Sequence, residues 1–297
     1  MKKRALNQIK PATNFIFNII FAVAAAVSIV PVIFVLMISF SSEFSLNHYG
    51  YRFIPTEFSM AAYNYLWRER RIIFNAFGIS VFVTVVGVLL GLVLTTTMGY
   101  VLSRREFKLR GFYTGVVFVP MIFNGGMIAS YVVMVHVLGL KDSIWALILP
   151  IAVSSFNIII CKTFFRSTIP DSIIESGKID GASQLQIFGQ IVLPISKPVL
   201  ATIGLFLSFG YWNDWFQAAL YITSTEKNSL QSLLNQILQN VEYMNKHPEY
   251  ATALQEQIPS ESVRMAIAIV VIIPIALAYP FFQKYFITGL TIGAVKG

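Results

Sequence analysis

Hydrophobic residues gather into long runs separated by short polar segments. Six runs reach the roughly 20 residues that a helix needs to cross a bilayer, and they lie near 15–40, 73–102, 112–136, 143–165, 199–222 and 263–286. The pattern predicts an all-α integral membrane protein with six transmembrane helices in a single domain over residues 1–297. Six spans place both termini on one side of the membrane.

The composition agrees with this pattern: 56% of the residues are hydrophobic and 12% are charged, against about 25% charged in soluble domains. The run after "MKKRALNQIK" exceeds the roughly 7 to 15 apolar residues of a cleaved signal peptide. It is therefore expected to remain as a helix.

The basic residues cluster at the ends of the apolar runs. If the N-terminus is cytoplasmic, the inner segments hold 14 of the 22 basic residues and 4 of the 14 acidic ones. The positive-inside rule favours this orientation, with both termini cytoplasmic. The net charge of +8 is thus a topology signal, and a nucleic-acid partner is not expected.

Glycines recur in the second run at Gly78, Gly87, Gly91 and Gly99. Small residues let helix backbones approach closely in lipid, so this run should be a central, packed helix. A second cluster, "FNGGMIASY" at 123–131, fits either a hinge or a close helix crossing, and the crossing is favoured.

Residues 170–198 form a polar segment that cannot span a membrane. Ser172 with Glu175, and Ser183 with Gln186, match the capping box that starts a helix. Gly181 lies between them, where a helix end favours a positive φ, and Pro194 and Pro198 should close the second helix. We expect two short helices joined by a turn.

The second of these helices has an apolar stripe. Leu185, Phe188 and Val192 fall at i, i+3 and i+7, which places them on one face of an α-helix. That face is predicted to dock on another surface. The alternative is an amphipathic hairpin that caps the bundle without a partner.

The segment resembles the coupling loop of ATP-binding-cassette (ABC) importer permeases, although Ser176 and Gly177 replace two alanines of the family motif. The resemblance implies a cytoplasmic coupling helix, formed by residues 171–193, that docks on an ATPase subunit. The positions that match are Glu175, Asp180, Gly181, Ala182, Phe188, Ile191, Leu193, Pro194 and Pro198.

Resemblance extends over nearly the whole chain. The segments "LGLKDSIWALILP", "WNDWFQAALYI" and "GLTIGAVKG" are similar to the smaller, six-helix permeases of maltose-type carbohydrate uptake, in the oligosaccharide subgroup of lipoprotein-linked and alginate-type permeases. This implies a type I importer fold in a bacterial cytoplasmic (inner) membrane. It also implies a second permease subunit, two ATPase subunits that bind ATP and magnesium, and an extracellular or periplasmic solute-binding protein.

Motifs for catalysis are absent from the sequence. "ESGKI" lacks the first glycine and the hydroxyl residue of a phosphate-binding loop, and neither H-E-x-x-H nor G-x-S-x-G occurs. The chain is expected to bind no cofactor or metal and to catalyse no reaction itself.

A polar and aromatic cluster, "WNDWF", ends the fifth run. Aromatic faces stack on sugar rings, and polar groups form hydrogen bonds with sugar hydroxyls. The cluster therefore fits a substrate path and, about equally, an interfacial aromatic belt. Its members are Trp212, Asn213, Asp214, Trp215 and Phe216.

Two outer loops carry further signals. Residues 223–262 begin with an apolar i, i+3, i+4, i+7 pattern from Leu230, which predicts an amphipathic helix, and continue into a polar segment that could contact a binding protein. Arg68, Arg70 and Arg71 could attract an acidic binding protein or a uronic oligosaccharide, or pair with Glu69 or lipid.

Other functions remain open at this point. The coupling loop is shared by ABC permeases for non-sugar solutes, although the flanking segments favour sugar. An ion-driven secondary transporter should show inverted repeats and several charged groups at mid-membrane, and a membrane enzyme should group polar residues near one interface. Asp214 alone satisfies neither.

Overall fold

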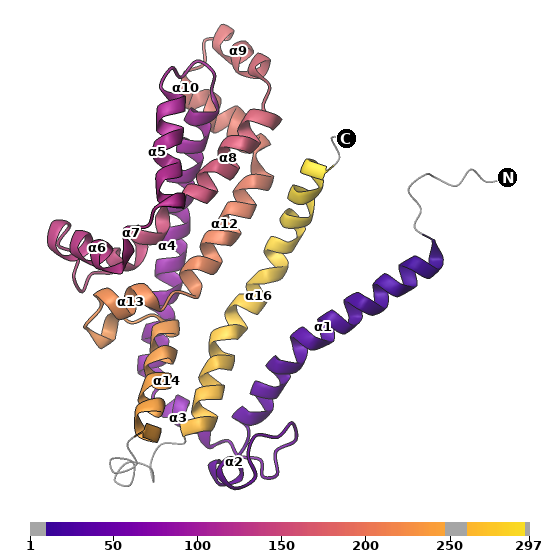
Figure 1. Ribbon diagram of the computed structural model, residues 1–297, viewed down its shortest axis with the longest axis vertical. Helices are drawn as coiled ribbons and strands as arrows, with labels where there is room; N and C mark the ends of the chain where they lie inside the picture. Colours follow the sequence, from indigo (N-terminus) through magenta and orange to yellow (C-terminus); the bar gives the residue numbers. More distant parts are fainter. Residues whose placement is uncertain (1–9, 247–259, 295–297) are drawn as a thin grey trace. The chain divides into compact units, whose positions relative to one another are not determined.

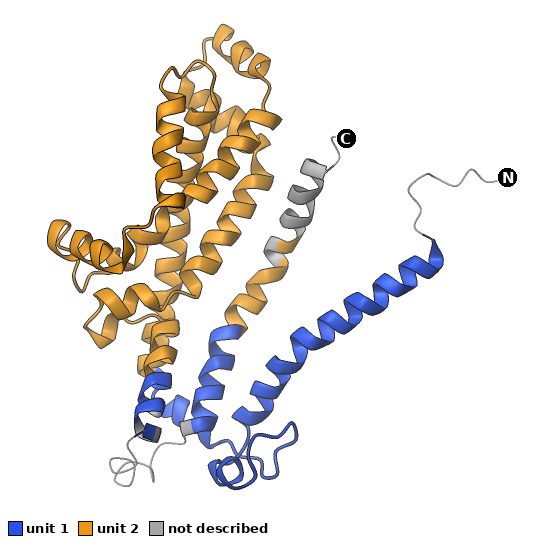
Figure 2. Ribbon diagram, viewed as in Figure 1, with its two compact units in different colours: residues 1–70, 237–272 blue, residues 71–236, 273–297 orange. Residues whose placement is uncertain are grey.

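The structure, a computed structural model, describes residues 10–246 and 260–294, and the regular elements in these ranges are helices. Figure 1 labels α-helices among them. Their contacts group into two compact units, coloured in Figure 2: unit 1 from residues 1–70 and 237–272, and unit 2 from residues 71–236 and 273–297. The expected single domain over 1–297 stays a prediction.

Unit 1 contains α1 (Pro11–Ser39), α2 (Glu43–Tyr49) and α3 (Ala61–Arg68), with parts of α14 (Leu230–Lys246) and α16 (Ser260–Ala294). Glu43 accepts hydrogen bonds from the backbone nitrogen and the hydroxyl of Ser262, both at 2.8 Å. The Tyr51 hydroxyl donates to Glu261 at 2.7 Å. These bonds tie the segment after α1 to the beginning of α16.

Unit 2 contains the remaining helices. Its elements are α4 (Arg70–Ser103), α5 (Arg110–Ile122), α6 (Gly126–Val132), the π-helix η1 (Val133–Val137), α7 (Trp145–Ala152), α8 (Ser155–Thr168), α9 (Asp171–Ile179), α10 (Gln184–Gln186), the π-helix η2 (Ile187–Val192), α11 (Leu193–Ile195), α12 (Lys197–Trp212), α13 (Phe216–Tyr221) and the 3₁₀-helix η3 (Thr225–Lys227), with the rest of α14 and α16.

Six candidate membrane spans occur in the described residues, but only three are single helices. These are Pro11–Ser39, Arg70–Ser103 and Glu261–Pro280. The others are bent pairs: α5 with α6 and η1 at 119°, α7 with α8 at 46°, and α10 to α11 with α12 at 82°. The predicted all-helical membrane fold is confirmed, while the shapes of three spans differ from the expectation.

The span expected at 112–136 is bent, because the chain turns sharply between Ile122 and Gly126. Gly126 has a φ of +82°, which side chains rarely tolerate, and a Cβ there would meet nothing within 4 Å. The glycine cluster at 123–131 therefore makes a bend, and the favoured interpretation as a close helix crossing is wrong.

Two other expected spans are interrupted. The span at 143–165 breaks between Ala152 and Ser155, after Pro150 has removed one helical hydrogen bond. The span at 199–222 ends at Trp212, and residues 213–215 separate it from α13. Apolar content predicted membrane depth in both cases but not helix continuity.

The glycine face of α4 packs closely on its neighbours, as predicted. A Cβ on Gly87 would lie 2.3 Å from the Tyr211 ring, and one on Gly99 would lie 2.6 Å from the Cβ of Cys161. Gly78 faces open space and does not share this role. The Tyr211 hydroxyl also donates to the Ile148 carbonyl at 2.7 Å, which joins α12 to α7.

Candidate functional site

The polar segment folds as a helical hairpin, which we call the hairpin unit and define as residues 171–195 (α9 to α11). The first expected capping box is wrong. Helix α9 starts at Asp171 after Pro170, so Ser172 lies inside the helix, and its carbonyl accepts from the Ser176 hydroxyl at 2.9 Å. Pro170 fixes an extended entry and Asp171 favourably faces the amino end of the helix dipole.

The second capping box is confirmed. The Ser183 hydroxyl accepts from the backbone of Gln186 at 3.3 Å, and the Gln186 side chain accepts from the backbone of Ser183 at 2.8 Å. Gly181 has a φ of +79°, and its backbone nitrogen donates to the Lys178 carbonyl at 3.0 Å. The predicted helix, turn and helix thus form with glycine at the turn.

Pro194 does not close the second helix. The chain stays helical through α11 and ends at Ile195, and Pro198 lies in the first turn of α12, where its missing N–H costs no bond. The preceding π-helix η2 has a wider turn than an α-helix. The wider turn also changes which side chains share a face.

The apolar stripe is accordingly split. Val192 is fully buried, and the Phe188 ring packs on Tyr100 with ring centroids 5.0 Å apart. Leu185 is 82% exposed and Ile179, just before the turn, is 85% exposed. The expected docking face is therefore wrong as a continuous stripe, and we call the pair Ile179 and Leu185 the hairpin tip.

The other motif residues divide between the surface and the interior. Ile191 packs beside Gly177, where a Cβ would lie 3.3 Å from its Cδ1 atom. Glu175, Asp180, Gly181 and Pro194 are exposed, and Ala182 and Leu193 are half-buried. The structure thus leaves two carboxylates next to the hairpin tip, where a partner could reach them.

Ion pairs at the base of the hairpin unit were missed from the sequence. Arg104 lies 3.4 Å and Arg105 3.8 Å from Asp171, and Lys178 lies 2.6 Å from Glu106. The sequence marks these basic residues only as topology signals, and their partners lie 66 to 72 residues away along the chain, so no local pattern indicates the pairs. These pairs fasten α9 to the end of α4.

A cavity of about 440 Å³ opens between this base and the second helix. Tyr100, Arg104 and Glu106 line one side, and Leu185 and Phe188 line the other. The arrangement offers apolar and charged contacts together.

The aromatic cluster does not form one surface. Trp212 is 8% exposed and packs edge-on to Phe77 with centroids 6.1 Å apart. Trp215 and Phe216 lie beyond the end of α12, pack edge to face at 5.9 Å, and are about two-fifths exposed. The two tryptophans therefore differ in environment.

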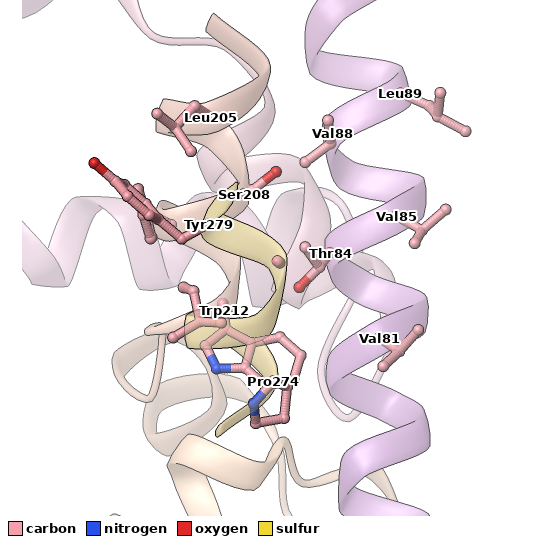
Figure 3. Close-up of a pocket in the computed structure, with 13 residues that line it drawn as sticks. Val81, Thr84, Val85, Val88, Leu89, Leu205, Ser208, Trp212, Pro274 and Tyr279 are labelled. Atoms are coloured by element: carbon pink, nitrogen blue, oxygen red, sulfur yellow. The ribbon is translucent and has the colours of Figure 1, made fainter. Parts of the chain in front are cut away.

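Trp212 lines an apolar cavity of about 370 Å³ between α4, α12 and the unit 2 part of α16 (Figure 3). Thr84, Ser208 and Tyr279 bring hydroxyls to its wall, but the Ser208 hydroxyl already donates to the Gly204 carbonyl at 2.7 Å. Few polar groups face the cavity. A sugar-binding role for it stays a prediction.

The polar members of the cluster bond locally. Asn213 donates to the Phe209 carbonyl at 3.0 Å, and the Asp214 carboxylate accepts from the Gln217 backbone at 3.3 Å. These bonds shape the connection between α12 and α13. The role of residues 212–216 in a substrate path remains a prediction.

At the opposite end of unit 2 from the hairpin unit, one carboxylate joins two loops. Asp142 accepts from the backbones of Thr223 and Ser224 at 3.0 and 2.9 Å, from the Ser224 hydroxyl at 2.5 Å and from Lys227 at 2.7 Å. We call this group of four residues the clasp. The hydrogen bond from Lys227, followed by those from Ser224 and Thr223, holds the pKa of Asp142 well below its ordinary value.

The backbone of Asp142 is also unusual, with a φ of +55°. Its nitrogen donates to the Tyr221 carbonyl at 2.8 Å, which helps to hold this conformation. Aspartate is among the few residues that visit this region. The clasp was not recognised from the sequence, because its donors lie more than 80 residues away.

Among residues 10–246 and 260–294, no three histidine, cysteine or acidic side chains come together as a metal site would require. The expectation that the chain itself binds no metal or cofactor stays a prediction.

Comparison with known proteins supports one family. Residues 87–292 match the model of the binding-protein-dependent transport system inner membrane component family. The chain is 40% identical over 275 residues to Protein LplC of Bacillus subtilis (strain 168), covering 92% of this chain and 90% of that protein. It is 41% identical over 273 residues to the polygalacturonan/rhamnogalacturonan transport system permease protein YtcP of the same strain, covering 92% of this chain and 94% of that protein.

A solved structure of a bacterial ABC transporter involved in the import of the acidic polysaccharide alginate is similar as well. It superposes with a TM-score of 0.80 at 31% identity, over 94% of this chain and 100% of that chain. The family match, the relatives and the helical membrane fold agree with one another. The chain belongs to the family of binding-protein-dependent transport system inner membrane components.

Proposed function

We propose that this chain is a permease subunit of an ABC importer for an oligosaccharide that contains uronic acid. The observation that carries the proposal is the hairpin unit with its exposed tip, within a chain that belongs to a transport permease family. Relatives named for polygalacturonan/rhamnogalacturonan and alginate transport support an acidic substrate. Relatives named for arabinooligosaccharides and galactooligosaccharides, at 27% and 31% identity, make a neutral oligosaccharide the second candidate.

The proposed complex contains a second permease, two ATPase subunits that carry ATP and magnesium, and a solute-binding protein. It lies in the inner membrane of a bacterium with both termini of this chain in the cytoplasm. The hairpin unit then faces the ATPase, and residues 171–193 transmit its closure to the membrane helices. Ion pairs from Asp171 and Glu106 to basic residues stiffen this connection.

Substrate recruitment would occur at the other side of the membrane. Residues 247–259, which include most of the segment expected to contact the binding protein, lie outside the described residues. Arg70 donates to the Trp67 carbonyl at 3.1 Å and lies over the Trp67 ring, so its charge is held by its own segment. A role of Arg68, Arg70 and Arg71 in attracting a uronic substrate stays a prediction.

The test is ATP hydrolysis by the reconstituted complex. Binding protein is loaded in turn with oligogalacturonate or with a neutral oligosaccharide of the same length. Stimulation by the uronic ligand alone supports the proposal, and stimulation by the neutral ligand alone transfers it to the second candidate. A complex that assembles and binds ATP but responds to neither sugar would contradict a carbohydrate substrate.

A further inference from the structure

Two groups of basic residues lie at the hairpin end of unit 2, and they differ in their partners. Arg104, Arg105 and Lys178 each pair with a carboxylate within 4 Å. Lys162, Arg166 and Arg110 have no ion pair among the residues that the structure describes. Arg166 follows Lys162 by one turn of α8, and Lys162 shares the Thr114 hydroxyl with the Arg110 carbonyl, so the three residues lie near one another. Their positive charge is available to an external anion.

Lys162 and Arg166 line a cavity of about 530 Å³ between α5 and α8, which we call the basic groove. The two helices pack on each other through a buried cluster that includes Val117 and Ile158. The basic groove therefore has a rigid floor. Its lining consists of Phe118, Ile159, Lys162, Thr163, Arg166 and Ser167, without a carboxylate.

The lining changes in character along the two helices. Since α5 begins and α8 ends at the hairpin end, Arg166 and Ser167 lie nearest the membrane surface and Lys162 lies one turn deeper. Phe118 and Ile159 lie deeper still, and Phe118 is 40% exposed. The order from cations and hydroxyls to apolar side chains matches a phospholipid, from its headgroup to its acyl chain.

The lysine is held in place for such a contact. Its ammonium donates to the Thr114 hydroxyl at 2.9 Å, and that hydroxyl donates to the Arg110 carbonyl at 2.6 Å. An ammonium has three donors, so two remain for a ligand. The Ser167 hydroxyl donates to the Phe164 carbonyl at 3.2 Å and keeps its lone pairs, so the cations carry the recognition.

We propose that the basic groove binds the phosphate headgroup of an anionic phospholipid, with Lys162 and Arg166 on the phosphate and Phe118 and Ile159 against the acyl chain. The proposal goes beyond transport and does not depend on the substrate. Because α8 leads through Ile169 and Pro170 into α9, a lipid bound there anchors the base of the hairpin unit to the membrane surface. A soluble phosphate shares the charge but cannot use the apolar wall.

Native mass spectrometry of the full chain in a mild detergent tests the proposal. Phosphatidylglycerol is titrated against phosphatidylcholine with the same acyl chains, and retained lipid is counted per chain. We expect one phosphatidylglycerol to be retained preferentially, and Lys162→Gln with Arg166→Gln to weaken its binding roughly 30-fold. Lys108→Gln with Lys197→Gln removes the same charge from exposed positions outside the basic groove and should leave binding unchanged.

Two further variants guard against misfolding. Arg166→Gln alone changes an exposed side chain and should weaken binding, while Arg166→Lys keeps the charge and should retain most of it. Equal retention of both lipids, or an equal loss in the control pair, would overturn the proposal. So would displacement of the lipid by glycerol phosphate, which would indicate a soluble anion, or by oligogalacturonate, which would make the groove part of the substrate path.

Discussion

The hairpin tip and the clasp, two regions of unit 2, differ in how far their side chains are satisfied by contacts within this chain. In the clasp, the Asp142 carboxylate is saturated by donors from its own chain, including Lys227 and Ser224. In the hairpin tip, Ile179 and Leu185 remain more than four-fifths exposed. The proposed docking of the ATPase on the hairpin unit would cover these two side chains. The clasp is satisfied by donors of this chain, whereas the hairpin tip is the surface proposed to contact a partner.

The largest expected effect is at the hairpin tip. Ile179→Asp with Leu185→Asp should abolish docking of the ATPase, because burying each apolar side chain contributes about 1.5 kcal/mol or more and two together correspond to roughly a 100-fold change in affinity. Pull-down of the ATPase subunits and transport in proteoliposomes measure this. The unfolding temperature of the permease should not change. A large drop in it would show that the hairpin tip stabilises the fold, which contradicts a role in docking alone.

Asp142→Ala should have the next largest effect, and it should lower the stability of the chain instead of the docking of the ATPase. It removes the carboxylate that accepts from the backbone nitrogens of Thr223 and Ser224 and leaves Lys227 only the carbonyl of residue 142, so the unfolding temperature of the purified chain should fall. Asp142→Asn keeps one acceptor oxygen, so its unfolding temperature should lie between those of the unchanged chain and Asp142→Ala. Docking of the ATPase to the protein that remains folded should be normal, and selective loss of docking would contradict the division of roles.

The stability that the clasp contributes should depend on pH through the Asp142 carboxylate. Hydrogen bonds lower the pKa of Asp142 below its ordinary value of 3.8, so the clasp stabilises the folded state above that pH and loses its effect as pH falls through the lowered value. The difference in unfolding temperature between the unchanged chain and Asp142→Asn should be constant from about pH 8 to pH 5 and shrink below about pH 4. A difference that already shrinks near pH 6 would exclude Asp142 as the group responsible.

The smallest expected effect is for Gly177→Ala. The added Cβ would lie 3.2 Å from Ile187, whose side chain can shift slightly, while alanine improves helix propensity by up to about 1 kcal/mol. Stability should change by less than about 1 kcal/mol, and transport should be retained. Gly177→Leu is the matched contrast, because its side chain would separate α9 from η2. Equal behaviour of the two variants would show that this packing does not matter.

The turn and its caps could be predicted because they depend on neighbours in the sequence. Ser183 and Gln186 satisfy each other within one helical turn, and Gly181 supplies a conformation that other residues resist. The expected cap at Ser172 failed for a local reason as well: with Pro170 at the N-cap position, α9 starts two residues earlier than a cap at Ser172 requires.

By itself, the sequence determined the membrane depth of the apolar runs, the close packing of the α4 glycines and the hairpin unit with its turn at Gly181. All of these follow from composition and short-range backbone preferences. Only the tertiary structure decided the burial of Phe188 and Val192, the clasp and the basic groove, whose two cations have no ion pair within the described residues. These features depend on contacts between segments that are distant in the sequence, and local sequence patterns do not predict such contacts.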